Sequence, residues 1–214
     1  MKLIYLESVE STQTYLKQYI KENQSQEIVL VYTHIQTNGI GSRDNSWDGK
    51  NGNLFFSFSI LKDQLPSDLP FSSASIYFSF ILKNLLKNQG SNLWMKWPND
   101  FYMDDKKLGG TITNMDKKYL YCGIGINTNY INDDYGYLDI KIDTKNLLIE
   151  YISIIKNKQL WKEIFSQFQV EFQRSKKFKT TVENEKISLQ NATLNNDGSI
   201  QIDGGKVYSL RWLK

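Results

Sequence analysis

A proline at position 98 lies inside a run of residues that otherwise favours a β-strand. The run begins near Leu93, and Pro98 has no amide hydrogen to donate to a neighbouring strand. We therefore expect a strand over residues 93–96 to end there, and Asn99 and Asp100 to turn out of the ladder. An Asn-Asp pair beside lysines offers oxygen ligands for a hydrated Mg²⁺ and positive charge for phosphate. The alternative interpretation is a solvated turn followed by a lysine-bearing hairpin.

A second informative segment runs from Gln36 to Asn53. It is polar and carries four glycines, which predicts a long flexible loop. Gly39 and Gly41 would let the backbone approach a ligand closely and point amides at an anion, and Trp47 offers a flat face for an adenine. The loop lacks the third glycine of a dinucleotide-binding motif and the Gly-Lys-Ser/Thr of a P-loop. The alternative is a mobile surface loop around a buried tryptophan.

The remaining segments alternate between strand and helix patterns. Ser11-Thr12 offers a helix N-cap, which is an explanation for these residues that needs no ligand. After Lys179, short β-type segments alternate with Asn-Asp-Gly and Asp-Gly-Gly turns. The sequence predicts an α+β fold, with a mixed or antiparallel sheet, helices on one side and a small all-β unit at the end. Strands are expected at residues 3–6, 27–35, 54–60, 93–96, 107–113, 119–126, 186–189, 199–202 and 206–210, and helices after residue 12, at 72–87 and at 145–172 with a break near 157–158.

Composition excludes several kinds of chemistry. A net charge of +3 over 214 residues is too small to indicate a nucleic-acid partner by itself. Cys122 is the single cysteine and His34 the single histidine, so an intrachain disulfide, a cysteine zinc site and a histidine pair are excluded. Both lie in apolar strand surroundings, and we expect them to be structural, as we expect Trp97 to fill the core. No apolar run reaches transmembrane length, so the expectation is a cytoplasmic protein with no membrane partner.

Taken in order and spacing, four segments resemble the catalytic module of biotin protein ligases. Residues 96–100 are the family's Lys-Trp-Pro-Asn-Asp string intact, and the family's catalytic lysine falls on Lys107. The other three segments are the Glu10-Ser11-Thr12-Gln13 helix start, the Gly-rich loop from Gln36 to Trp47 with Gly52-Asn53-Leu54 behind it, and the Gly123-Ile124-Gly125-Ile126-Asn127 strand end. In addition, the C-terminal segment with its glycine turns is similar to the family's SH3-like barrel.

This resemblance implies a class II synthetase-like catalytic module at residues 1–176 and a small SH3-like β-barrel at 177–214. It implies a ligase that activates biotin with MgATP to biotinyl-5′-AMP, releases pyrophosphate and transfers biotin to a specific lysine of a biotin carboxyl carrier protein. The acceptor would belong to acetyl-CoA carboxylase or another biotin carboxylase, and a homodimer is a further expectation. Because Met1 lies only ten residues before Ser11, we expect no N-terminal DNA-binding domain and no DNA partner.

The resemblance also assigns roles to single residues. Lys107 and Arg43 are the catalytic assignments, since a well-placed cation stabilises the charge that builds on oxygen in both steps. Asp100 is assigned to Mg²⁺. The nucleotide is assigned to Arg43, Trp47, Lys96, Asn99 and Asn127. Biotin is assigned to Ser11, Thr12, Gln13, Gln36, Gly39, Ile40, Gly41, Ser42, Lys107, Gly110, Gly123 and Gly125.

The Gly-rich loop departs from the family at the positions of its arginines. Ile40 and Ser42 stand where the family has arginines, and Asn45 falls on a later basic position. Either Arg43 or Lys50 replaces the lost guanidinium and the adenylate stays sequestered, or the adenylate is held loosely and leaks to other acceptors. We favour the first outcome because the loop keeps both glycines and its tryptophan.

Three other interpretations fit the sequence less well. A lipoate ligase or octanoyl transferase would use the same fold and a lysine, but the Lys-Trp-Pro-Asn-Asp string and the tryptophan that ends the loop favour biotin. A non-catalytic module that binds biotin or a nucleotide is disfavoured by the lysine at position 107. A globular protein with chance matches is disfavoured by four segments in the same order.

The loop hypothesis predicts that Arg43→Ala impairs the enzyme. Loss of the guanidinium should weaken biotin and ATP binding or slow turnover, because Arg43 would take over phosphate contacts from the missing arginines. Calorimetric titration and pyrophosphate release measure the two effects. Unchanged affinities and unchanged turnover would overturn this hypothesis.

Overall fold

The main sheet of the protein combines one parallel pair of strands with antiparallel pairing elsewhere. The computed structural model describes residues 1–41, 46–47, 52–182, 185–202 and 204–209, with only the backbone at 46–47. Within these ranges the main sheet has seven strands in the order β1-β2-β5-β9-β8-β7-β6. Helix α1 (Thr12–Asn23) connects the parallel pair, as a parallel connection requires. The strands are β1 (Lys2–Tyr5), β2 (Val29–Thr33), β5 (Leu54–Leu61), β6 (Trp94–Lys96), β7 (Asp100–Met103), β8 (Lys106–Met115) and β9 (Tyr119–Ile126).

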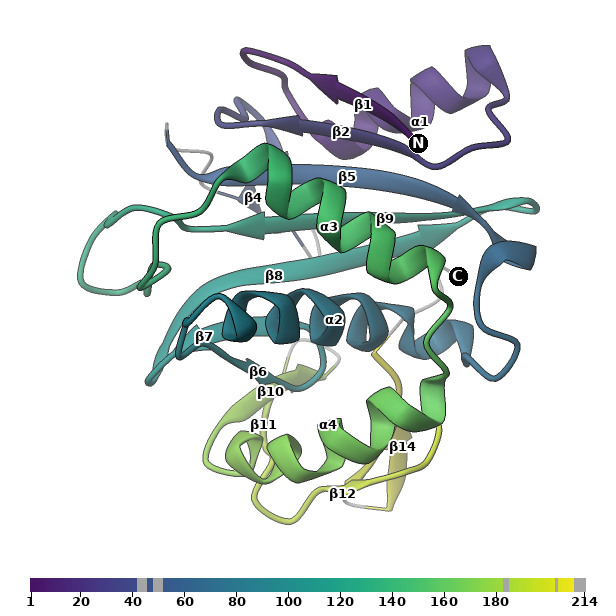
Figure 1. Ribbon diagram of the computed structural model, residues 1–214. Helices are drawn as coiled ribbons and strands as arrows, with labels where there is room; N and C mark the ends of the chain where they lie inside the picture. Colours follow the sequence, from purple (N-terminus) through teal and green to yellow (C-terminus); the bar gives the residue numbers. More distant parts are fainter. Residues whose placement is uncertain (42–45, 48–51, 183–184, 203, 210–214) are drawn as a thin grey trace.

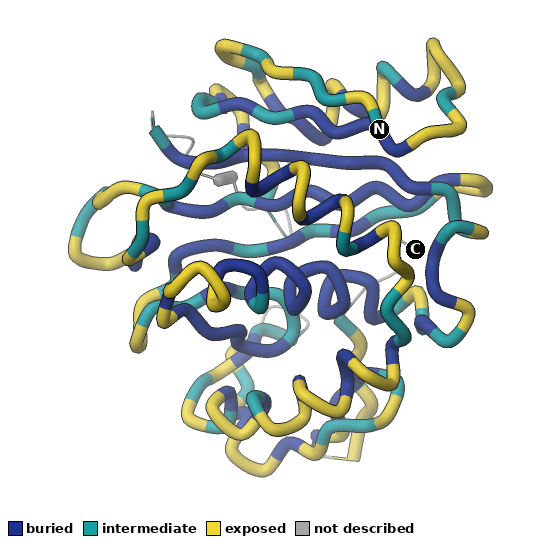
Figure 2. Tube along the Cα trace, viewed as in Figure 1, coloured by how far each residue is buried: buried dark blue, intermediate teal, exposed yellow. Residues whose placement is uncertain are grey.

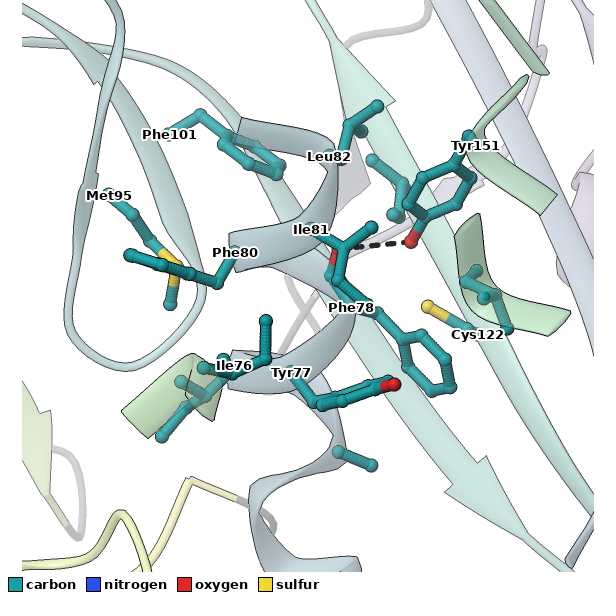
Figure 3. Packing of buried hydrophobic residues seen from close by; sticks show 14 of the residues in the cluster. Ile76, Tyr77, Phe78, Phe80, Ile81, Leu82, Met95, Phe101, Cys122 and Tyr151 are labelled. Atoms are coloured by element: carbon teal, nitrogen blue, oxygen red, sulfur yellow. Dashed lines mark hydrogen bonds between the residues drawn. The ribbon is translucent and has the colours of Figure 1, made fainter. Parts of the chain in front are cut away.

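Two helices cover one face of this sheet, and a third lies along its β6 edge. They are α2 (Ala74–Asn88), α3 (Thr144–Lys156) and α4 (Trp161–Ser175). Figure 1 shows α2 and α3 lying across the near side of the strands, and Figure 2 shows the strands and α2 mostly buried. Helices α3 and α2 are joined by a hydrogen bond of 3.0 Å from the Tyr151 hydroxyl to the carbonyl of Phe78, drawn in Figure 3. The break expected near residue 157 separates α3 from α4, so that prediction is confirmed.

The expectation that all helices lie on one side is wrong. Leu16 and Ile20 of α1 pack with Val29 and Val31 of β2 in a second apolar cluster. Leu30, between these two valines, belongs instead to the main core. Because successive strand residues point to opposite faces, α1 lies on the face away from α2 and α3. Both faces of β2 are apolar, which a period-two pattern cannot reveal.

The N-terminus of α1 is capped as the sequence predicts. The Ser11 hydroxyl accepts a hydrogen bond of 3.4 Å from the Thr14 amide, and Ser11 itself is extended. A serine in this position satisfies one of the amides that a helix leaves unpaired at its start. The cap fixes where α1 begins, and the first helical residues are Thr12 and Gln13.

Strands β6 and β7, on either side of Pro98, form a tight hairpin. Lys96 is paired with Asp100, and Asp100 is also paired with Gly110 of β8. The prediction that Asp100 leaves the ladder is therefore wrong, and β7 was not predicted. Pro98, preceded by a cis peptide bond, lies at the turn, where no ladder donor is needed. Asn99 does lie in the turn, and its carbonyl accepts a hydrogen bond of 2.9 Å from the Thr111 amide.

Helix α4 closes the exposed edge of β6. The Met95 amide donates to Glu171 Oε1 at 2.7 Å, and the Trp97 amide donates to the Ser175 hydroxyl at 3.0 Å. Side chains of α4 thus replace the partner strand that an edge strand lacks. These bonds hold the residues that lead into the Pro98 turn.

The C-terminal residues form small β-sheets. A hairpin joins β10 (Lys179–Val182) to β11 (Glu185–Ser188), and a three-stranded sheet contains β12 (Thr193–Leu194), β13 (Ile200–Ile202) and β14 (Gly205–Val207). The predicted β segments are present, while the SH3-like barrel and the division at residue 176 stay predictions. The Gln36–Asn53 segment is also less irregular than expected, since β3 (Gly39–Ile40) pairs with β4 (Ser46–Trp47). No helix within the described ranges combines the length and the apolarity needed to span a bilayer.

Two indoles attach the C-terminal sheet to the rest of the fold. Trp97 Nε1 donates to the Gly198 carbonyl and Trp161 Nε1 to the Asn196 carbonyl, both at 2.9 Å. Trp97 is also 1% exposed, so the prediction that it fills the core is confirmed. The turn before β13 is therefore held from both the Pro98 hairpin and α4.

We predict that Trp97→Phe loosens this attachment. The change leaves the Gly198 carbonyl without its donor and opens a small cavity, which should lower the free energy of unfolding by about 1–3 kcal/mol. Hydrogen exchange should become faster at residues 193–202. Trp94→Phe is the matched control, because Trp94 Nε1 donates to the Asp104 carbonyl at 2.8 Å. If the control accelerates exchange at residues 193–202 equally, the attachment through Trp97 is wrong.

Candidate active site

A cavity of about 340 Å³ opens beside α1, on the face of the sheet that this helix covers only in part. Its position follows from the alternation of large and small residues. On β5, Phe56 and Phe58 belong to the main core, whereas Ser57 between them lines the cavity. On β9, Gly123 and Gly125 line the cavity beside core residues. Small side chains on alternate positions therefore leave space on one face while the other face packs tightly.

One end of the cavity is polar and uncharged. The Thr12 amide donates to Gln36 Oε1 at 2.8 Å, and the Thr12 hydroxyl donates to the same oxygen at 3.1 Å. The Thr12 and Ser57 hydroxyls lie 2.8 Å apart and share another hydrogen bond. All three residues are buried, so the donors and acceptors at this end hold fixed directions.

Gln13 lies beside this group. Its Nε2 donates to Asn114 Oδ1 on β8 at 2.8 Å. Gln13 Oε1 is buried and has no hydrogen-bond partner among the described residues. A Cβ atom on Gly123 would lie 2.9 Å from this oxygen and 3.2 Å from the Ser57 hydroxyl oxygen. Glycine is therefore required at position 123 if Gln13 is to reach the cavity.

The other end is charged. Lys107 Nζ lies 2.6 Å from Asp100 Oδ1, and Lys96 Nζ lies 3.4 Å from Asp100 Oδ2. The Lys107 side chain is 34% exposed and that of Lys96 only 7%, so Lys107 is the accessible cation of the pair. The two ends are separated by about 7 Å, since Gly110 at the charged end and Ile112 at the polar end are two residues apart on β8.

Burial and nearby charges shift the pKa of Asp100 in opposite directions. Burial, the largest single influence, favours the neutral carboxyl group. The charges of Lys107 and Lys96, with the hydrogen bonds that both donate, together outweigh it and hold the Asp100 pKa below its ordinary value. The group is therefore a carboxylate bound to two ammonium groups.

Two asparagines near the charged end, Asn99 and Asn127, hydrogen-bond to backbone carbonyls, and Asn127 also bonds to the side chain of Asn53. Asn99 Nδ2 donates to the Thr111 carbonyl. Asn127 Oδ1 accepts from Asn53 Nδ2 at 3.2 Å, and Asn127 Nδ2 donates to the Gly136 carbonyl at 3.2 Å. Asn127 thus joins the end of β9 to the loop that follows it. Any contact with a nucleotide would use the remaining hydrogen-bonding capacity of these amides.

The structure brings most of the predicted residues to one cavity. Lys96 lies behind Asp100, and Gly39 is buried and does not line the cavity. Ser42 and Arg43 lie outside the described residues, and only the backbone of Trp47 is described. Predicted residues that line the cavity are Ser11, Thr12, Gln13, Gln36, Ile40, Gly41, Asn99, Asp100, Lys107, Gly110, Gly123, Gly125 and Asn127.

Sequence reasoning missed several lining residues. The missed residues are Phe55, Ser57, Thr111, Ile112, Ile124, Ile131 and Tyr135. Ser57 could have been found, because it is a small residue on the strand face opposite two phenylalanines. Ile131 and Tyr135 come from the loop after β9, where no periodic pattern indicates which side chains turn inward.

A resident metal ion has little support from the side chains. Across the described ranges, no group of three or more His, Cys, Asp or Glu residues could hold a metal. Asp100 is the carboxylate in the cavity, and both its oxygens face lysines. Its role toward Mg²⁺ stays a prediction.

The single histidine and the single cysteine lie away from the lining of this cavity. His34 Nδ1 and the Asn53 carbonyl lie 3.0 Å apart, and Cys122 is buried, which raises the pKa of its thiol.

Comparison with known proteins assigns the family. The model of the biotin/lipoate A/B protein ligase family matches residues 5–129, which is more than half of the chain. The chain belongs to this family. The biotin acetyl coenzyme A carboxylase synthetase of Helicobacter pylori, crystallised with bound biotinylated ATP, is 36% identical, with a TM-score of 0.91 over 97% of this chain and 99% of that chain.

Two further ligases of the family bear on fold and length. The biotin protein ligase of Aquifex aeolicus, in complex with biotin and ATP, is 24% identical with a TM-score of 0.76 over 97% of this chain and 94% of that one, which supports the shared fold. The bifunctional ligase/repressor BirA of Bacillus spizizenii is 28% identical over 138 residues, which are 62% of this chain and 42% of BirA. The chain thus spans less than half of that curated relative.

We predict that Asp100→Asn destabilises the protein in a pH-dependent way. At neutral pH the change should lower the free energy of unfolding by about 2–3 kcal/mol, because it leaves two lysines without their carboxylate. A carboxyl group with a lowered folded pKa contributes stability above its ordinary value of 3.8 and loses it as the pH falls through the folded value. Denaturant unfolding of both proteins at neutral and acidic pH should therefore converge in acid. Asp105→Asn, at an exposed position in the next turn, is the control. A difference that persists unchanged into strong acid would contradict the ion-pair account.

Proposed function

We propose that this protein is a biotin protein ligase, which activates biotin with ATP and transfers it to a lysine of a carrier protein. The observation that carries the proposal is a single cavity with a polar, uncharged end and a charged end. Ser11, Thr12, Gln13 and Gln36 would bind the ring of biotin at the first end. Lys107 would meet its carboxylate and the nucleotide at the second. The cavity volume lies within the range of small-molecule sites.

In the first step a carboxylate oxygen of biotin attacks the α-phosphorus of ATP. A new oxygen–phosphorus bond forms, the bond to the pyrophosphate breaks, and biotinyl-AMP remains in the cavity. Negative charge increases on the phosphoryl oxygens in the transition state, and a fixed cation at that point lowers the barrier. Lys107 would supply this cation, and its ion pair with Asp100 at the charged end supports the assignment.

In the second step the amine of the acceptor lysine attacks the acyl carbon. The carbon–oxygen bond to AMP breaks, AMP leaves as an anion, and the amine loses a proton to solvent. Lys107 would again stabilise the charge on the departing oxygen. Lys96, deeper in the protein, keeps Asp100 ionised and would face the phosphates only from behind this carboxylate.

Magnesium fits the cavity as a partner of the nucleotide. Mg²⁺ usually binds through one or two carboxylates together with phosphates and water. Asp100 and the side-chain oxygens of Asn99 and Asn127 are the oxygens available. When bound, the ion would neutralise phosphate charge during the displacement.

The polar end favours biotin over lipoate. A ring that carries a urea group can hydrogen-bond to Thr12, Gln13 and Gln36, whereas a dithiolane ring cannot. The carrier would be the biotin carboxyl carrier protein or domain of a carboxylase such as acetyl-CoA carboxylase, and we place the reaction in the cytoplasm, where ATP is supplied. A homodimer stays a prediction.

One assay tests this function. The protein is mixed with labelled biotin, MgATP and a biotin-carrier domain, and label is sought on the carrier. We expect transfer of biotin that depends on ATP and on the carrier lysine. Transfer of lipoate in place of biotin would reject the proposal.

We predict that Lys107→Ala slows formation of the adenylate by about 100-fold or more, by loss of its charge at the phosphoryl group. Pyrophosphate release in the absence of carrier measures this step. Lys106→Ala is the matched control, because Lys106 is exposed in the same hairpin, and it should stay within about twofold of the original protein. Normal adenylate formation by Lys107→Ala would reject the site assignment.

A further inference from the structure

The side-chain amide of Gln13 is oriented from outside the cavity. Asn114 on β8 accepts a hydrogen bond from Gln13 Nε2 at 2.8 Å. An amide that is bonded through its nitrogen turns its oxygen to the other side. Gln13 Oε1 accordingly lies over Gly123, 2.9 Å from the point that a Cβ atom there would occupy.

The Gln13 Oε1 atom is a buried acceptor without a donor among the described residues. Gln13 is 4% exposed, and Oε1 has no hydrogen-bond partner within the part of the chain that the structure describes. Most buried polar atoms in proteins are satisfied, so such an atom at a ligand cavity indicates where a donor of the ligand lies. The nearby Thr12 and Ser57 hydroxyls are already bonded to each other.

We propose that Asn114 is a positioning residue at the polar end of the cavity. It fixes the direction of the Gln13 amide, so that Gln13 Oε1 accepts a hydrogen bond from an N–H group of the bound acid. This inference rests on the proposed function and deepens it. The cyclic urea of biotin carries N–H groups, while the dithiolane ring of lipoate and the alkyl chain of octanoate carry none. An acid without an N–H group leaves Gln13 Oε1 buried and unsatisfied, which lowers its affinity.

The direction of the Gln13 amide depends on an acceptor at position 114. The amide oxygen and nitrogen are close in size, so the group can reverse without needing more space. A leucine at position 114 has nearly the shape of asparagine and cannot accept. The reversed amide would then present its NH₂ group to the N–H of the ligand, and donor would face donor.

Aspartate at position 114 provides the conservative variant. Its carboxylate can only accept, so it keeps Gln13 Nε2 turned away from the cavity. Lys17, Lys21 and Asp116 line the same hollow as Asn114, between α1 and the β8–β9 hairpin, and the two lysines would balance the two carboxylates present in the variant. Asn114→Asp and Asn114→Leu therefore differ chiefly in the ability to accept a hydrogen bond.

The test is the affinity of the full chain for biotin and for lipoate, measured by calorimetry. Asn114→Leu should weaken biotin binding about tenfold, as expected for one lost hydrogen bond, and leave the weaker lipoate binding unchanged. Asn114→Asp should bind biotin within about twofold of the original protein. In pyrophosphate release at saturating MgATP, the leucine variant should raise the KM for biotin and keep kcat.

Other results overturn the inference. They are an unchanged biotin affinity in Asn114→Leu, an equal loss for both acids, or an aspartate variant as weak as the leucine variant. If the leucine variant does not fold, Gln13→Met removes the acceptor itself and should weaken biotin but not lipoate. Failure of the unaltered protein to bind biotin would instead reject the proposed function, and no variant is needed to see it.

Discussion

The middle of β5 and the end of β9 carry large side chains on one face and small ones on the other, and the site depends on this difference. Phe56 packs against Tyr151 of α3 and Phe58 against Phe78 of α2, so the two strands cannot shift or turn over without exposing these rings. Ser57 and Gly123 are thereby fixed on the opposite face. Since α1 covers only part of that face, the space above the small residues stays open to a ligand. The floor of the cavity is thus a consequence of core packing.

The charged end is built on the same sheet by a different means. The Pro98 turn brings Lys96 and Asp100 opposite each other, and the pairing of β7 with β8 brings Lys107 to the same carboxylate. One carboxylate thereby pairs with two lysines, one buried and one at the cavity, and the group keeps a net positive charge. This arrangement keeps Lys107 in place before the substrates arrive, and the phosphates of ATP can then take over its charge. Rigid strands thus provide the preorganisation that electrostatic catalysis requires.

Much of this arrangement could be predicted from the sequence, and the failures have identifiable causes. Long periodic segments such as β9 and α2 were predicted within a few residues, because their apolar periods follow directly from burial. The prediction that Asp100 lies outside the ladder fails because a hairpin can turn at a proline and resume pairing on the other side. The position of α1 on the second face depends on tertiary packing, which local patterns do not encode.

The candidate residues were predicted mainly through resemblance, and their spatial grouping was not. Thr12, Gln36 and Ser57 share hydrogen bonds across separations of 24 and 45 residues in the chain. No local pattern links residues so far apart. Asn114, the partner of Gln13, is separated from it by 101 residues, so the sequence does not predict this contact either.

The central claim is that the acid is activated by bond formation between its carboxylate oxygen and the α-phosphorus of ATP. Biotin labelled with ¹⁸O in its carboxylate tests this claim most directly, when it is incubated with the protein, MgATP and a carrier domain. The account predicts ¹⁸O in the phosphate group of the AMP released, because the bridging oxygen leaves with AMP. Appearance of ¹⁸O in inorganic phosphate, with ADP as the other product, would contradict it.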